Sequence, residues 1–107
     1  MIEETVKKLI EEENGSISEV GLYQLCGNIV SRMCLRLGTD ELPSEFNHIA
    51  VDACIKLYRR HYYEGISSEN CGGLSVSFVE DILNEYSKEV EMYKEMHAKG
   101  SETETVI

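Results

Sequence analysis

Apolar residues recur at helical spacing in four separate stretches of this 107-residue chain, and no other feature limits its fold as strongly. The stretches cover residues 2–13, 22–37, 46–62 and 79–97. A helix with one apolar stripe must bury that stripe against another element, and the third stretch carries two such rows. We therefore expect an all-α, four-helix bundle-like domain in which the third helix is central and packs on two faces.

Turn and capping residues mark the ends of these helices. Asn14-Gly15 and Gly38 stand where a helix C-terminus favours a left-handed residue. Residues 16–19 (Ser-Ile-Ser-Glu) and 77–80 (Ser-Phe-Val-Glu) have the spacing of a capping box, which satisfies unpaired amides at a helix start. Pro43 is suited to the first turn of the third helix, because its missing amide hydrogen has no acceptor there.

The segment between the third and fourth helices differs from the rest of the chain. The third helix should end near Glu64-Gly65, and residues 66–73 are rich in Ser, Asn and Gly. Residues 74–78 (Leu-Ser-Val-Ser-Phe) then alternate with the period of a strand, which predicts a short extended arm or hairpin. A lone strand has no partner within this chain. We expect the arm, residues 66–78, to be mobile in a free subunit and ordered by a neighbouring one.

The chain divides into one folded domain and a short tail. We expect residues 1–100 to form a single helical domain with one core, and residues 101–107 to form a flexible C-terminal tail. Thr, Val and Ile in this tail favour extended backbone, so we expect it to dock as an added strand on the sheet edge of a partner. Simple fraying of the terminus is the alternative.

Charge excludes one class of partner. Twenty Asp and Glu against ten Lys and Arg give a formal net charge of −10, which repels a phosphate backbone at long range. A protein that reads DNA sequence is therefore disfavoured. No apolar run approaches the ~20 residues that cross a bilayer, so we expect a soluble protein with no membrane partner.

The residues that most often carry chemistry are scattered. These are three histidines and four cysteines: His48, His61, His97, Cys26, Cys34, Cys54 and Cys71. The histidines lack neighbouring nucleophile or acid patterns, and the cysteines lack the closely spaced pairs of a structural zinc site. We expect buried thiols in a reducing cytoplasm, no catalytic residue, no metal, no cofactor and no enzyme activity.

One stretch of the sequence is specific enough to indicate a protein family. Residues 58–78, with sequence YRRHYYEGISSENCGGLSVSF, resemble the head-tail connector (adaptor, head-completion) proteins of tailed bacteriophages. Members of that family pair a helix ending in Tyr and Arg with an EGxxSE-type turn, a Gly, an alternating strand and a last helix rich in Tyr and acidic residues. The Leu42-Pro43 pair before an amphipathic helix is also similar. The resemblance covers somewhat more than half of the chain, and residues 70–72 (Asn-Cys-Gly) depart from it.

The resemblance implies a structural function. Subunits of such a family assemble into a ring of about twelve copies under the portal protein. DNA passes through the ring without sequence-specific binding, and the tail or the next head-completion protein attaches to it. A lumen lined by carboxylates would repel the passing phosphates. The implied locations are the virion and, during assembly, the host cytoplasm. The alternative function is a small helical protein-binding regulator of phage or bacterial origin.

The candidate residues for contacts between subunits or with the portal lie in the arm, its flanks and the tail. They are Arg59, Arg60, Tyr62, Tyr63, Glu64, Gly65, Ser68, Glu69, Leu74, Val76, Phe78, Thr103, Thr105 and Ile107. Arg and Tyr side by side are favoured anchors at protein interfaces. For Arg59 and Arg60 the simpler alternative is that cations near a helix C-terminus complement the helix dipole.

Overall fold

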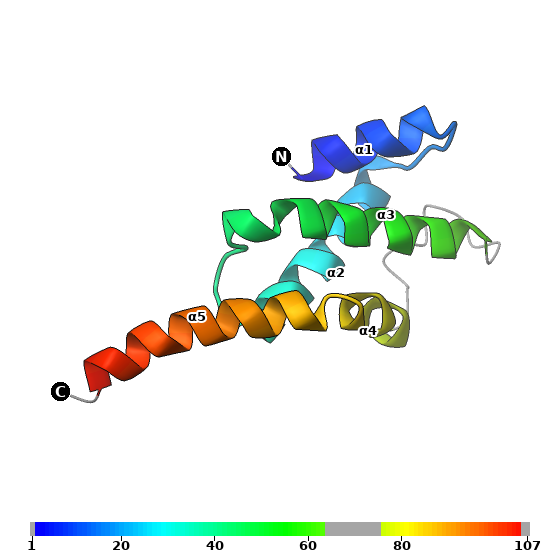
Figure 1. The fold of residues 1–107 in the computed structure, drawn as a ribbon. Helices are drawn as coiled ribbons and strands as arrows, with labels where there is room; N and C mark the ends of the chain where they lie inside the picture. The colour runs from blue at the N-terminus through cyan, green and yellow to red at the C-terminus, as the bar shows by residue number, and fades with distance from the viewer. Residues whose placement is uncertain (1, 64–75, 106–107) are drawn as a thin grey trace.

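The computed structural model describes residues 2–63 and 76–105, and these residues contain helices and no strand. Figure 1 shows their arrangement. The elements are α1 (Ile2–Glu12), α2 (Glu19–Leu37), the short 3-10 helix η1 (Ser44–Phe46), α3 (Asn47–Tyr63), α4 (Val76–Asn84) and α5 (Ser87–Thr105). The predicted all-α, bundle-like class is confirmed.

Helix α3 lies at the centre of the molecule. It packs against α1, α2 and α4, and α2 crosses behind it (Figure 1). Both of its predicted apolar rows are buried, one around Ala53 and Leu57 and the other around Cys54 and Tyr58. From α2, Leu25, Ile29 and Met33 complete the core, each with no exposed surface. The prediction of a central helix packed on two faces is therefore confirmed.

Left-handed residues end the first two helices as predicted. Asn14 has φ 64° and Gly38 has φ 73°. The start of α2 differs from the prediction, because Ser18 and not Ser16 is the cap, and its hydroxyl oxygen accepts a hydrogen bond from the Gly21 amide at 3.0 Å. Pro43 stands just before η1 with ψ 145°, so it precedes the first turn instead of lying within it.

The predicted fourth helix is two helices, α4 and α5. At the break the amides of Glu85 and Tyr86 bond to the carbonyls of Ile82 and Leu83 at 3.1 and 3.0 Å, three residues back instead of four. The Ser87 hydroxyl donates to the Asn84 carbonyl at 2.9 Å. These bonds close the end of α4 and let the chain change direction before α5 begins (Figure 1).

The predicted extended arm is wrong where the structure describes it. Residues 76–78 belong to α4, and residues 66–75 lie outside the described part. Val79 is buried and its neighbour Phe78 packs against the same core, which a helix allows, whereas a strand points adjacent side chains to opposite faces. A helix also satisfies its backbone groups without a partner strand.

Residues 101–105 of the predicted C-terminal tail are helical in the chain alone, and docking of the tail as a strand on a partner stays a prediction. Helix α5 continues across the expected domain boundary at residue 100 and includes Ser101 to Thr105. Residues 106 and 107 lie outside the described part. In the absence of a partner edge, the helix pairs backbone groups that a lone strand would leave open.

Candidate interaction surfaces

Arg59, a predicted interface residue, holds the turn after α1 against α3. Its Nε and Nη2 atoms lie 3.2 and 2.5 Å from the two carboxylate oxygens of Glu13. This two-point contact is the geometry in which a guanidinium binds a carboxylate best. The hydrogen bond from Arg59 lowers the pKa of Glu13 below its ordinary value.

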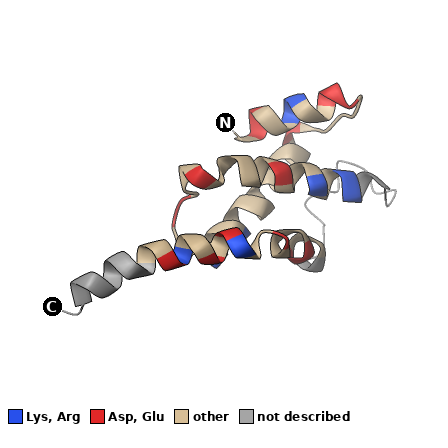
Figure 2. Cartoon of the chain, viewed as in Figure 1, with Lys and Arg blue, Asp and Glu red and all other residues tan. Residues whose placement is uncertain are grey.

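Arg60 joins α3 to α4. Its Nη1 lies 3.8 Å from Asp81 Oδ2, and its guanidinium carbon lies 5.0 Å from the ring centre of Phe78, another predicted site residue. Figure 2 shows these cations gathered toward the C-terminal end of α3. Both arginines remain about half exposed, so an additional role at an interface stays a prediction.

The other predicted site residues are described only in part. Tyr62, Tyr63, Val76, Thr103 and Thr105 lie in helices, but their side chains are outside the described set. Glu64, Gly65, Ser68, Glu69, Leu74 and Ile107 lie outside the described residues altogether. Of the predicted site residues, the structure brings Arg60 and Phe78 into contact, whereas the neighbouring Arg59 pairs with Glu13 instead.

Two further arginines, Arg32 and Arg36 on α2, hold α4 in position. Arg36 Nη2 bonds to Glu80 Oε1 and lies 3.0 Å from Asn84 Oδ1, and Arg32 Nη1 lies 3.3 Å from Glu80 Oε2. The hydrogen bond from Arg36 is the main cause that lowers the pKa of Glu80. Helix α4 is short, and these contacts fix its orientation on α2.

Tyr86 anchors the break between α4 and α5 to α3. Its hydroxyl donates to Asp52 Oδ2 at 2.5 Å, and Lys56 Nζ lies 5.0 Å from the centre of its ring. Lys56 also bonds to Glu85 Oε1 at 2.8 Å, which raises the pKa of Lys56. Burial, followed by the bond to Asp52, raises the pKa of Tyr86 to about 12. The hydroxyl thus stays protonated and able to donate.

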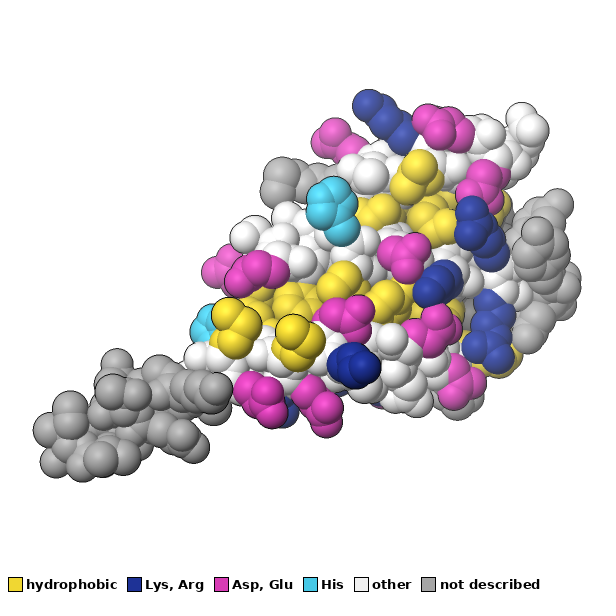
Figure 3. Space-filling model, viewed as in Figure 1, with side chains coloured by type: hydrophobic (Ala, Val, Ile, Leu, Met, Phe, Trp, Pro, Cys, Tyr) yellow, Lys and Arg dark blue, Asp and Glu magenta, His cyan; other side chains and the backbone are white. Residues whose placement is uncertain are grey.

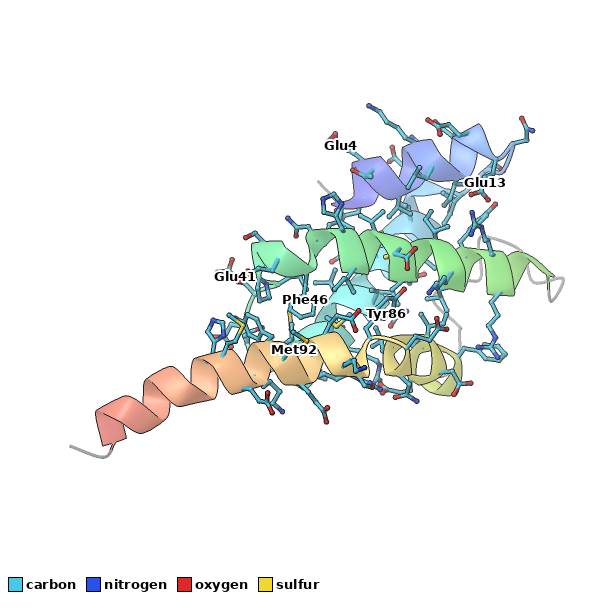
Figure 4. The ribbon with its side chains drawn as sticks, viewed as in Figure 1. Glu4, Glu13, Glu41, Phe46, Tyr86 and Met92 are labelled. Carbon is cyan, nitrogen blue, oxygen red and sulfur yellow. The ribbon has the colours of Figure 1, made fainter. Side chains whose placement is uncertain are left out.

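Beyond these contacts, a shallow groove lies between α5 and the start of α3. We call it the methionine groove and define it by eight residues: Glu45, Phe46, Ile49, Glu89, Met92, Tyr93, Met96 and His97. Its volume is about 250 Å³. Figure 3 shows apolar side chains along the boundary between α3 and α5, and Figure 4 shows Met92 and Phe46 in the space between them.

Aromatic rings pack together in the floor of the methionine groove, and its rim is open. Tyr93 meets Phe46 edge to face at 5.5 Å and stacks on His97 at 4.0 Å. Met92 and Met96 have 57% and 71% of their surface exposed. Two neighbouring methionines exposed one helical turn apart are unusual beside a well-packed core, because a long apolar side chain gains from burial.

A second apolar surface lies on α2. This surface, the α2 face, consists of Val20, Tyr23, Gln24, Gly27, Val30, Ser31, Cys34 and Leu35, which share one side of the helix and carry no charge. Val20, Tyr23 and Leu35 are 66%, 71% and 76% exposed. A hollow of about 710 Å³ adjoins the C-terminal half of the face, and space is open above Gly27. The α2 face and the methionine groove share no residue.

Neither surface was predicted from the sequence, although each had a signal. On α2, Val20, Tyr23 and Leu35 form a second apolar row, offset around the helix from the row that became the core. On α5, Met96 belongs to the predicted apolar stretch 79–97, but it is 71% exposed, and Met92 one turn earlier is 57% exposed. A second apolar row needs a partner of its own, and the described part of the domain leaves these residues largely exposed.

Among the described residues, the thiols and the acidic groups do not gather into a metal site. Cys26, Cys34 and Cys54 are free and buried as predicted, and Cys71 is outside the described part. A hydrogen bond with Cys26, together with burial, raises the pKa of Cys54, so this thiol stays protonated. Within residues 2–63 and 76–105, no three His, Cys, Asp or Glu side chains converge as metal ligands, and no helix is long and apolar enough to cross a membrane.

The comparisons with known proteins identify no relative of this chain. No family model matches the chain, and neither a curated protein nor a solved structure shows significant similarity to it.

Proposed function

We propose that this chain is a structural head-tail connector (adaptor) subunit of a tailed phage or prophage. In this proposal copies of the chain form a ring under the portal protein, DNA passes through the ring, and the tail or the next head-completion protein attaches to it. The proposal joins the resemblance of residues 58–78 to a physical property of the described domain.

That property is the exposure of two separate apolar surfaces on one small domain. A closed ring requires each subunit to touch neighbours on two sides, and an adaptor must also bind a different protein. A monomer without partners would gain by covering both surfaces. The α2 face, which is uncharged in a chain of net charge −10, is suited to contact between copies, because carboxylates elsewhere on the surface repel one another.

The test is the mass of the protein alone and after mixing with purified rings of its cognate portal. We expect a defined number of copies to join each portal ring. Leu35→Glu should reduce this number sharply, since it places a charge in the centre of a contact between copies. Lys8→Glu, at an exposed position on α1, is the matched control and should assemble like the wild-type protein. Portal rings that gain no mass would contradict the proposal.

The methionine groove also favours the second candidate, a small helical regulator that binds another protein. A regulator needs only one such groove and no contact between copies. The same measurement separates the two functions, because a regulator would leave the mass of the portal ring unchanged and would be insensitive to Leu35→Glu.

A further inference from the structure

We infer that the methionine groove binds a basic amphipathic helix of another protein. This inference goes beyond the ring proposal, because it depends only on the groove and its charges.

The shape of the groove suits a helix. One wall is the η1–α3 segment with Phe46 and Ile49, and the other is α5 with Met92 and Met96, one turn apart. A helix that lays an apolar face into a groove presents side chains at the same one-turn spacing. Methionine side chains adapt to such ligands because they are unbranched and polarisable.

The charge at the rim of the groove favours a basic helix as its ligand. Glu45 and Glu89 line the groove from opposite walls, and no Lys or Arg lines it. Neither carboxylate forms an ion pair with another described residue, whereas the lysine and arginines of α3 sit toward its other end, as Figure 2 shows. A second copy of this acidic chain would bring further carboxylates to the rim. A helix with lysines or arginines beside its apolar face would instead be attracted.

A synthetic peptide tests the inference. The probe is a fluorescently labelled helix of about four turns with leucines on one face and lysines on the other. It is titrated with the full chain and compared with a scrambled Leu/Lys peptide and a Leu/Glu helix of the same pattern. We expect the Leu/Lys helix to bind most tightly, with an affinity that falls as salt is added.

Variants separate docking from simple charge attraction. Met92→Glu and Met96→Glu remove apolar contact but make the protein more acidic, so docking predicts affinities weaker by about tenfold or more, and bulk attraction predicts tighter binding. Leu35→Glu adds the same charge to the α2 face and should keep the affinity within about twofold. The double variant Glu45→Gln, Glu89→Gln should weaken binding and reduce its salt dependence.

Three outcomes would overturn the inference. They are unchanged or tighter binding by Met92→Glu, equal binding of the scrambled peptide, and equal binding of the Leu/Glu helix. Circular dichroism of each variant verifies that it is folded, which we expect because the replaced side chains are exposed. The peptide experiment contains no portal rings, so a negative result would not contradict the ring proposal. In the same way, a failure to bind portal rings would not contradict binding of a helix in the methionine groove.

Discussion

Helix α3 and helix α5 are both long, and they serve the molecule in different ways. Helix α3 is covered on two faces, and Ala50, Ala53, Cys54 and Leu57 have no exposed surface. Helix α5 buries Val90 and part of Tyr93 and then exposes Met92 and Met96. Apolar residues on α3 therefore stabilise the fold, whereas several on α5 remain available to a partner.

This difference predicts opposite responses to the loss of an apolar side chain. Leu57→Ala, in the centre of α3, should lower the free energy of unfolding by about 2–5 kcal/mol, because it removes transfer energy and leaves a cavity. Met96→Ala on α5 should change it by no more than about 0.5 kcal/mol. Urea unfolding followed by circular dichroism gives both values. Equal losses would mean that α5 is part of the core.

Tyr86 holds the junction between α4 and α5 against α3. Tyr86→Phe keeps the ring beside Lys56 and removes the hydroxyl that donates to Asp52, so we expect a loss of about 0.5–1.5 kcal/mol in the free energy of unfolding. Tyr23→Phe, at an exposed position on α2, is the matched control and should have no measurable effect. If both variants unfold like the wild-type protein, the hydroxyl does not hold the junction.

The bond between α2 and α4 should make stability depend on pH. Glu80 has a lowered pKa in the folded chain, so its pairing with Arg36 contributes stability above the unfolded value of 4.5, and that contribution is lost as the pH falls through the folded pKa. The pair is partly exposed, so we expect about 0.5–1 kcal/mol at pH 7. Comparison of wild type with Glu80→Gln at several pH values measures it. If the difference in the free energy of unfolding between wild type and Glu80→Gln grew as the pH fell, the pairing of Glu80 with Arg36 would not be its cause.

The α5 surface residues should have the smallest effect on stability. Met92→Glu should leave the thermal midpoint within about 2 °C of the wild type, because the side chain is already exposed to water. Differential scanning calorimetry makes this measurement. A large fall in the midpoint would show that the methionine groove is closed in solution by contacts within the chain.

The first three helices could be predicted from the sequence because local chemistry marks their ends. Asn14 and Gly38 adopt the left-handed conformation that their residue types favour, and the apolar rows of α3 became the core. The break at residues 85–86 was hidden, because Leu83, Tyr86 and Val90 keep a helical spacing across it and are all buried. The contact that anchors the break to α3, between Tyr86 and Asp52, joins residues far apart in the sequence and leaves no local pattern.

The strand prediction failed at residues 76–78 for a related reason. Alternation over residues 74–78 is short, and a few residues match both periods. Packing of Phe78 and Val79 against the core favours the helix that residues 76–78 adopt. The candidate surfaces were missed because exposure depends on which apolar rows find a partner within the fold. The sequence contains these apolar rows, but it does not show which of them the folded chain covers.

Electron microscopy of the protein mixed with its cognate portal tests the central proposal most directly. The account predicts an additional ring stacked coaxially on the portal ring, with one copy of this chain for each portal subunit and an open channel through both. The Leu35→Glu variant should leave the portal bare or incompletely covered. Portal rings that carry no added density at saturating concentrations of the folded wild-type protein would contradict the account.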